Sequence, residues 1–384
     1  MFAGLLAFGF INAVLGPALP YLRAAEHISY LVGALHQAAF AVGGGLAGLL
    51  AARGDGSLGR GTTIRLGLVG AAVVGLGIGY GDAVAMTVPA AFLVSLLGTS
   101  ALVRMWAVLA DAHGERRTVA MAEGEVSVSL GGIVTPLLVG GLAATALTWR
   151  FSFVIGGVIV ALAALAVGTV RIPRPATRPP ALPRTAGTRA QRLLLAPTLV
   201  VVLAIVALEF ALSFWLASYL DDSVGLSRGL AVVMVSGLYA ANLVGRVVTS
   251  RLARRVATER LLAASLIVAL IGVCVLLAAG DAPAAGIGIA LAGVGVGAMF
   301  PLISSLHVGV SSLNADGAIG QVLSIAAIGQ MVGPLAAGAI AQTAGLRAGL
   351  LVVPALIVLA AVALARYPNQ ARNHAPAELE TANL

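Results

Sequence analysis

Long apolar segments separated by short polar breaks constrain this chain more than any other feature of its sequence. Of its 384 residues, 60% are hydrophobic and 10% are charged, whereas a soluble domain carries about a quarter charged residues. Because one core cannot bury so much apolar surface, we expect lipid to be the solvent for much of it. A helix crosses the hydrocarbon layer with about 20 apolar residues. The segments predict twelve such helices, at residues 1–20, 29–52, 62–81, 83–110, 117–144, 150–170, 196–220, 227–250, 257–279, 282–307, 317–344 and 346–366.

The arginines predict how these helices are oriented. The net charge is +8 and the chain contains no lysine. Most arginines lie in the short gaps between apolar segments, and not in a stripe that would bind nucleic acid. With the N-terminus inside, 19 of the 23 basic residues lie on the cytoplasmic side, and Arg23, Arg150, Arg228 and Arg347 lie outside. The positive-inside rule therefore predicts a multi-pass protein of the cell inner (plasma) membrane with both termini in the cytoplasm.

The sequence repeats itself at an offset of 198 residues. The shift places Tyr21-Leu22 on Tyr219-Leu220, Arg53 on Arg251, Gly131 on Gly329, Pro136 on Pro334 and Gly140 on Gly338. A parallel repeat implies two bundles related by an axis along the membrane normal. Because the first apolar segment then pairs with the seventh, and no basic residues precede it, we expect it to be retained and not cleaved as a signal peptide.

The repeat also predicts the division of the chain. An N-terminal six-helix bundle is expected over residues 1–170 and a C-terminal six-helix bundle over residues 196–367. Residues 171–195 are rich in arginine and proline and contain no acid, so we expect an extended cytoplasmic linker there. Residues 368–384 are polar, and a disordered cytoplasmic tail is expected.

Five segments carry a recognisable order of residues. They are GFINAVLGPALPYLR from Gly9, GLLAARGDGSLGR from Gly48, GRVVTSRLARR from Gly245, ALEFALSFWLASYL in the seventh apolar segment and GVGVGAMFPL in the tenth. Together they resemble the major facilitator superfamily, and in particular its fucose-permease-like sugar:proton symporters. The resemblance implies an all-α membrane protein with twelve transmembrane helices in two pseudo-symmetric six-helix bundles, the major facilitator fold, and transport by alternating access.

Two sets of residues resemble signatures of that family. The fifth and eleventh segments carry its helix-packing glycines and prolines: Gly131, Pro136, Gly140, Gly329, Gly333, Pro334 and Gly338. The loops after the second and eighth segments resemble its cytoplasmic gate: Gly48, Arg53, Asp55, Arg60, Gly245, Arg246 and Arg251. Guanidinium–carboxylate contacts there would hold an outward-open state. The alternative is that these arginines only fix the topology.

Glu209 and His36 are the candidate proton-coupling residues. A charge in hydrocarbon costs about 2.5 kcal/mol on insertion scales, which makes Glu209, near the middle of the seventh segment, a functional candidate. A carboxyl group removed from water can exchange a proton near neutral pH, and histidine changes charge in the same range. The alternatives are a packing role for Glu209 and a place in an aqueous vestibule for His36.

The resemblance implies a solute site near the midplane, lined by the first, fourth, seventh and tenth helices. Polar side chains there would orient the solute and aromatic rings would offer a stacking face. Trp215 has an alternative role as a membrane-interface anchor. The candidates are Asn12, Glu209, Trp215, Tyr239, Asn242, Phe300 and Gln330.

Arg104 lies near the end of the fourth segment, and Glu123 and Glu125 lie at the start of the fifth. We expect an ion pair between these helices, with a structural role because a charge left alone there would be costly; the alternative is contact with the solute. The nearby segment DAHGERR from Asp111 lacks the spacing of a metal site, so no metal and no cofactor are expected.

These features favour a proton-coupled importer of a sugar or organic acid. The alternative is a proton antiporter that exports amphipathic drugs or metabolites, which the glycine–proline pattern favours. A membrane enzyme or a sensor is the remaining class, but we find neither a nucleophile–base set nor an appended effector domain. The expected partners are a small-molecule solute, protons and the lipid bilayer, without nucleic acid, and we expect a monomer.

Overall fold

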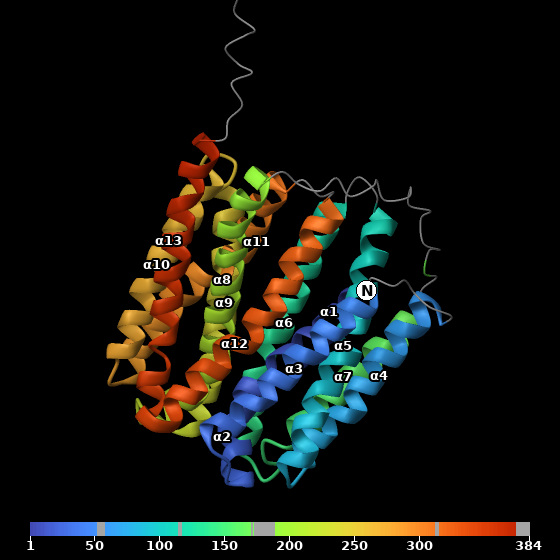
Figure 1. Ribbon diagram of the computed structural model, residues 1–384. Coiled ribbons are helices and arrows are strands. Elements are labelled where there is room, and N and C mark those ends of the chain that lie inside the picture. The colour runs from blue at the N-terminus through green and yellow to red at the C-terminus, as the bar shows by residue number, and fades with distance from the viewer. Residues whose placement is uncertain (52–57, 114–116, 170–171, 173–188, 312–314, 374–384) are drawn as a thin grey trace, which may run out of the picture.

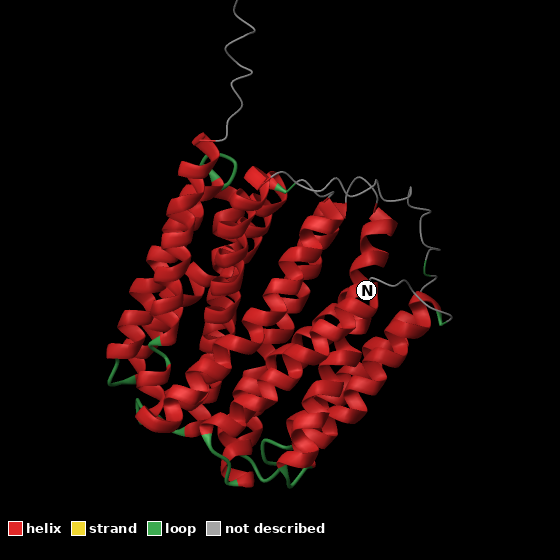
Figure 2. Ribbon diagram, viewed as in Figure 1, coloured by secondary structure: helices red, strands yellow, loops and turns green. Residues whose placement is uncertain are grey.

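The computed structural model describes residues 1–51, 58–113, 117–169, 172, 189–311 and 315–373, and these residues form helices and short loops without a strand (Figures 1 and 2). The helices are α1 (Phe2–Ala13), α2 (Leu15–Glu26), α3 (Tyr30–Ala51), α4 (Gly59–Tyr80), α5 (Val84–His113), α6 (Arg117–Ala143), α7 (Phe151–Gly168), α8 (Arg189–Asp222), α9 (Arg228–Leu252), α10 (Thr258–Ala278), α11 (Ala282–Val310), α12 (Ala315–Gly349) and α13 (Val352–Asn373).

Within the described residues, eleven helices are long and apolar enough to cross a membrane, and Val352–Arg366 of α13 is a shorter apolar helix. α1 and α2 form one candidate span, Phe2–Glu26. They are divided at Val14, where Pro17 has no N–H to donate to the Ala13 carbonyl. The expected all-α membrane fold is confirmed.

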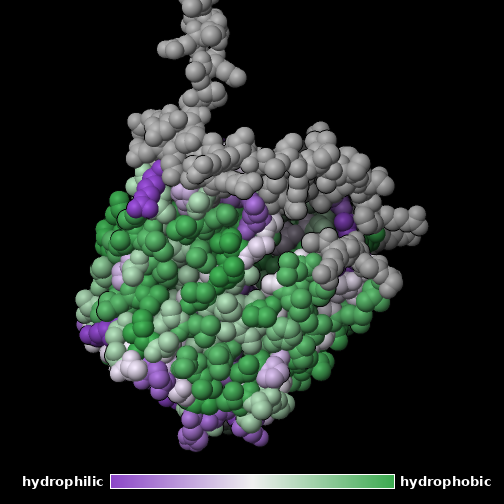
Figure 3. All heavy atoms as spheres, viewed as in Figure 1, coloured by the Kyte–Doolittle hydropathy of each residue, from purple (hydrophilic) through white to green (hydrophobic). Residues whose placement is uncertain are grey.

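The helices run between two ends of the molecule. We call the end at which α7 stops and α8 starts the linker end, and the end at which α2 and α8 stop the far end; the linker end is at the top of Figure 1. Figure 3 shows apolar side chains over the middle of the visible face and polar side chains toward both ends. This is the distribution that a bilayer with water on both sides requires.

The two halves of the chain repeat one arrangement. Three helices of the first half begin 198 residues before three helices of the second: Tyr30 and Arg228, Val84 and Ala282, Arg117 and Ala315. The sequence offset is therefore also an offset between helices, as two pseudo-symmetric bundles require.

Glycines set the closest helix contacts inside each half. A Cβ at Gly131 of α6 would overlap the Leu6 carbonyl of α1. Its counterpart Gly329 of α12 lies against α8, where a Cβ would come within 2.8 Å of the Leu203 carbonyl. Gly333 approaches the Ala207 backbone still more closely. Small residues allow this contact between helix backbones in a membrane, so these three glycines occupy packing positions.

The two halves meet at equivalent residues. Gly16 of α2 lies against the backbone of Phe214 in α8, 198 residues further along, where a Cβ would come within 3.2 Å of the Phe214 Cα. Equivalent residues touch where a pseudo-two-fold axis passes between two halves. The crossing of α2 and α8 therefore marks the axis.

Two further contacts close the far end in the same symmetric way. Gly140 of α6 lies against Val233 of α9, and Gly338 of α12 lies against Ala34 of α3, with would-be Cβ distances of 2.8 and 2.9 Å. At the linker end, Figure 3 shows the surface hollowed between the two sets of helices. The molecule is therefore closed at the far end and hollow at the linker end.

Most of the expected linker, residues 173–188, and the end of the expected tail, residues 374–384, lie outside the described residues. α8 begins at Arg189, inside the segment expected to be the linker, and α13 continues to Asn373, beyond the expected start of the tail. The expected domain boundaries stay a prediction.

Candidate transport site

Glu209 lies midway along the apolar part of α8, which runs from Ala196 to Asp222. Its side chain is partly exposed and makes no hydrogen bond within the described part of the chain. The charged groups that act on it are Arg246 of α9 and Glu125 of α6. A carboxyl group at this depth without a fixed hydrogen-bond donor is available to a proton or to a solute.

Tyr239 of α9 lies near this carboxyl group and also contacts α6 of the other half. Its ring packs on Gly132 of α6, 3.2 Å from the position that a Cβ would take. Its side chain interacts with Ser213 and lies within electrostatic reach of Glu209. The structure therefore brings Tyr239 and Glu209 together at the interface between the halves.

Three other predicted solute contacts keep part of their surface exposed. Asn12 lies in α1, Phe300 in α11 and Gln330 in α12. The Asn12 and Gln330 side chains make no hydrogen bond within the described residues, so their amide groups are open to a ligand. Their role as solute contacts stays a prediction.

Two predicted solute contacts are instead used for packing. Trp215 is fully buried, and its Nε1–H donates to the Pro334 carbonyl of α12 at 3.0 Å. Asn242 is buried between α9 and α11, where its amide nitrogen is placed to donate to the Gly293 carbonyl at 2.8 Å. In this conformation neither side chain reaches an open site, because each satisfies a main-chain carbonyl inside the second half.

His36 lies in a buried polar chain within the first half. Its Nε2 is 2.9 Å from the Thr87 Oγ1 of α5, and Thr87 donates to the Glu26 carboxylate at 3.3 Å. His36 is completely buried. The partners of His36 are therefore different from the groups that act on Glu209, although both residues were predicted to couple protons.

The expected ion pair of Arg104 with Glu123 or Glu125 stays a prediction for Arg104, whereas Glu125 has another partner in the structure. Glu125 bonds Arg246 of α9, with 2.8 Å between Oε2 and Nη1, and Glu123 is exposed. The physical reason is that this face of α6 packs on α9, so the nearest guanidinium to Glu125 comes from the other half. Arg104 is buried in α5.

The charged residues of the predicted gate differ in position and in partner. Arg53 and Asp55 lie outside the described residues. Arg60 of α4 pairs with Asp111 of α5 inside the first half, whereas Arg246 crosses between the halves. Arg251 is exposed at the end of α9.

The two glycines of the predicted gate differ from each other. A Cβ at Gly48 would meet nothing within 4 Å, whereas one at Gly245 would overlap the Val294 carbonyl of α11. Gly245 therefore lies at the contact between α9 and α11, two helices of the same half. Of the other signature residues, Pro136 is buried in α6 and Pro334 accepts the Trp215 bond described above.

A polar cluster at the far end was not predicted. Asp222 of α8 accepts from Arg23 of α2 at 3.0 Å and from the Tyr30 hydroxyl of α3 at 2.8 Å. The Arg23 guanidinium also lies 3.8 Å from the centre of the Tyr30 ring. Two helices of the first half are thus bonded to one carboxylate of the second. Opposite charges at the same end of two spans are the signal that could have indicated it.

A second unpredicted cluster lies at the linker end of the second half. His307 of α11 is buried. Its Nδ1 lies 2.8 Å from the Thr198 Oγ1 of α8, and its Nε2 lies 3.2 Å from the side-chain amide oxygen Oε1 of Gln321 in α12. Both ring nitrogens have partners, so this cluster ties three helices together.

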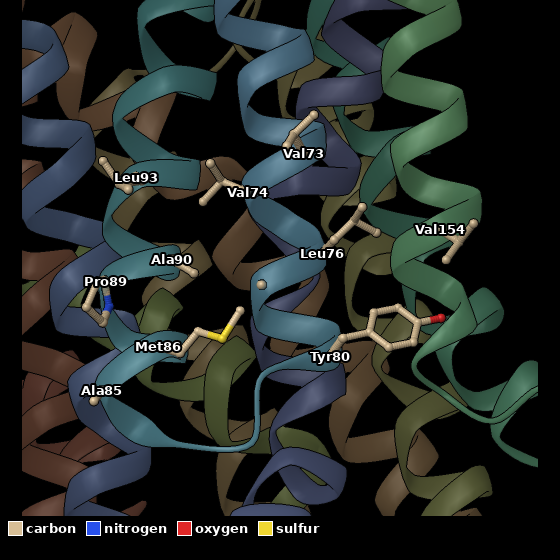
Figure 4. A pocket seen from close by; sticks show the side chains of 11 residues that line it. Val73, Val74, Leu76, Tyr80, Ala85, Met86, Pro89, Ala90, Leu93 and Val154 are labelled. Carbon is tan, nitrogen blue, oxygen red and sulfur yellow. The ribbon is translucent and has the colours of Figure 1, made fainter.

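A groove of about 760 Å³ lies on the outside of the first half (Figure 4). Figure 4 shows it between α4 and α5, with Tyr80 and Val154 of α7 at one side. Its lining is apolar: Val73, Val74, Leu76, Gly77, Tyr80, Ala85, Met86, Pro89, Ala90, Leu93 and Val154. The Tyr80 hydroxyl is the one polar side-chain group among these lining residues, and the candidate site remains at the interface of the halves.

Comparison with known families matches residues 1–317 to the Major Facilitator Superfamily. A search of curated proteins by sequence finds no match.

Solved structures with the same fold include three transporters. A bacterial homologue of the human lysosomal transporter Spinster, in an inward-facing and occupied conformation, has a TM-score of 0.75 at 16% identity, over 97% of this chain and 95% of that one. The nucleoside transporter NupG has a TM-score of 0.76 at 11% identity, over 96% and 98%. A D-xylose-proton symporter has a TM-score of 0.74 at 16% identity, over 95% and 96%. At these identities the likeness shows the fold.

Proposed function

Because the chain belongs to the Major Facilitator Superfamily and is therefore a secondary transporter, we propose that it imports a small polar solute together with protons and that Glu209 carries the proton. The observation that supports this most is the place of Glu209: midway along a membrane helix, partly exposed and without a hydrogen bond in the described part of the chain. A carboxyl group there changes its charge at low cost only if it can exchange a proton with water in the cavity.

Alternating access is supported by the difference between the two ends. The far end is held by Asp222 and its two partners from the first half, and the linker end is hollow (Figure 3). With the arginine-rich side in the cytoplasm, this is an inward-open state. For outward opening, the bonds to Asp222 must break and the linker end must close.

Charge favours a neutral solute such as a sugar over an organic acid. Two carboxyl groups, Glu209 and Glu125, and one guanidinium, Arg246, are the charged groups of the site. An added anion would meet repulsion from Glu209 unless Glu209 were protonated. The amides of Asn12 and Gln330 suit hydroxyl groups, and Phe300 offers a face for a sugar ring.

The alternative is export of an amphipathic cation in exchange for protons. Glu209 without a fixed partner, next to the aromatic ring of Tyr239, would also attract an organic cation. We keep this candidate because the same carboxylate would then bind proton and cation in turn, which is antiport.

The test is transport in proteoliposomes, after a thermal-shift screen with sugars, organic acids and cationic dyes has found a ligand. Import predicts that the solute accumulates on the alkaline side of a pH gradient, and export predicts the acidic side. In Glu209→Gln, proton-driven accumulation should fall at least about tenfold, which corresponds to 1.4 kcal/mol of coupling, while solute exchange without a gradient persists. Glu123→Gln, an exposed carboxyl group on α6, is the control. Unchanged accumulation in Glu209→Gln would exclude it as the proton carrier.

A further inference from the structure

Arg246 connects three helices from its place in α9. Its Nη1 lies 2.8 Å from the Glu125 carboxylate of α6, and its Nε donates to the Gly297 carbonyl of α11 at 3.1 Å. Glu125 belongs to the first half and Arg246 to the second, so this ion pair crosses the interface. It lies in the linker-end halves of α6 and α9, and the side chains of Arg246 and Glu125 are 30% and 50% exposed.

The same guanidinium is also within electrostatic reach of Glu209. α8 and α9 pack on each other, and Glu209 lies deeper in the membrane than Glu125. One guanidinium therefore serves two carboxyl groups from different halves. While Glu125 holds the guanidinium, Glu209 has no hydrogen-bonded cation among the described residues, and a carboxylate left alone at this depth is costly.

We propose that Arg246 is a switch residue that binds either Glu125 or Glu209, so that proton release from Glu209 breaks the ion pair between the halves. Glu209 gives its proton to water in the hollow, and its carboxylate then takes the guanidinium from Glu125. The Glu125 carboxylate is half exposed and is solvated by the same water. In this exchange Glu209 becomes negative by losing its proton to water, and Arg246 and Glu125 keep their charges.

Other titratable groups near these helices do not replace Arg246 in this exchange. Tyr239 of α9 faces Glu209 but interacts with Ser213. His307 of α11 is bound at both nitrogens by Thr198 and Gln321. Glu123 of α6 is exposed, and Arg251 is exposed at the end of α9.

The inference rests on the proposed function only in taking Glu209 as the proton carrier, and its test needs no solute. The measurement is the infrared band of the protonated carboxyl group in the full-length protein in lipid, assigned to Glu209 by its loss in Glu209→Gln. In Glu125→Gln, Arg246 is free to bind Glu209, so the band at neutral pH should fall at least about threefold. In Arg246→Gln the band should persist at neutral pH and above.

Glu123→Gln is the matched control, two residues from Glu125 on the same helix, and should leave the band unchanged. Arg246→Lys keeps the charge and should keep the pH dependence, which separates loss of charge from a folding defect; size-exclusion profiles check folding of each variant. An unchanged band in Glu125→Gln, or an equal loss in Glu123→Gln, overturns the proposal. Absence of a Glu209 band in the unsubstituted protein overturns it too. If the band behaves as expected but no proton-driven transport is found, the proposed function fails and the switch stands.

Discussion

The two halves of this transporter share their packing contacts but not the charged residues of the candidate site. Gly131 packs α6 on α1 as Gly329 packs α12 on α8, and Gly140 closes the far end as Gly338 does. The residues of the candidate site have no such partners. Shifted by 198 residues, Glu209 falls on Ile11 and Arg246 on Gly48.

This difference between packing residues and charged residues shows which positions of a duplicated fold can change. Each packing glycine touches the backbone of another helix, so a side chain added there moves a whole helix. Glu209 and Arg246 each keep part of their surface exposed, and neither packs against another helix backbone as these glycines do. We infer that packing keeps the halves alike, while one carboxyl group in one half suffices for coupling.

The largest expected effect tests the shared packing. Gly131→Ala and Gly329→Ala should each destabilise the protein by about 2 kcal/mol, because a Cβ at either position must displace a neighbouring backbone. The measurement is thermal unfolding of the purified protein in detergent, with a fall in midpoint of about 5 °C. Gly141→Ala, where a Cβ meets nothing within 4 Å, is the control. A large effect in one half and none in the other would mean that Gly131 and Gly329 do not have equivalent packing roles.

A smaller effect is expected at the far end, where two adjacent carboxylates differ in what they hold. Asp222 accepts from Arg23 and Tyr30 of the other half, whereas Asp221 pairs with Arg228 of its own half at 2.7 Å. Partly exposed ion pairs contribute up to about 1 kcal/mol. Asp222→Asn should therefore raise the ratio of far-end-open to far-end-closed molecules about fivefold, and Asp221→Asn should change it less than twofold.

Spin labels can measure this ratio. Ala25 and Ser227 are exposed at the far end, one in each half, and Cys274→Ser removes the single cysteine. In pulsed EPR, Asp222→Asn should add a population at longer distance between labels at these two positions. Equal distance distributions in the two variants would mean that Asp222 does not hold the far end closed.

Hydropathy and repetition were enough to predict an all-α membrane protein built from two repeated bundles, and the resemblance of the motifs added the family fold. Apolar length determines whether a segment crosses the membrane, and the offset seen in Gly131 and Gly329 reappears in the starts of the helices. The depth of Glu209 was also predictable, because depth follows from position along a span.

The direction in which a side chain points was not predictable in the same way. Trp215 and Asn242 have the depth of solute contacts but bond main-chain carbonyls of neighbouring helices. A polar group in a span can satisfy its hydrogen bonds either in a cavity or on another helix, and hydropathy is the same for both. The partner of Glu125 was missed because Arg246 is 121 residues away, and sequence proximity favoured Arg104.

The smallest expected effect concerns Gly48, the counterpart of Arg246. A Cβ at Gly48 meets nothing within 4 Å, and glycine inside a helix costs about 0.5–1 kcal/mol relative to alanine. Gly48→Ala should therefore raise the stability to unfolding by no more than about 1 kcal/mol. Gly245→Ala, in the equivalent region of the second half, should lower it, because a Cβ there overlaps the Val294 carbonyl. Both are measured as shifts of the thermal midpoint, together with solute exchange. If Gly48→Ala is stable but exchange is lost, this face of α3 must pack on another helix when the linker end closes, and Gly48 would then serve the motion that the gate signature implies.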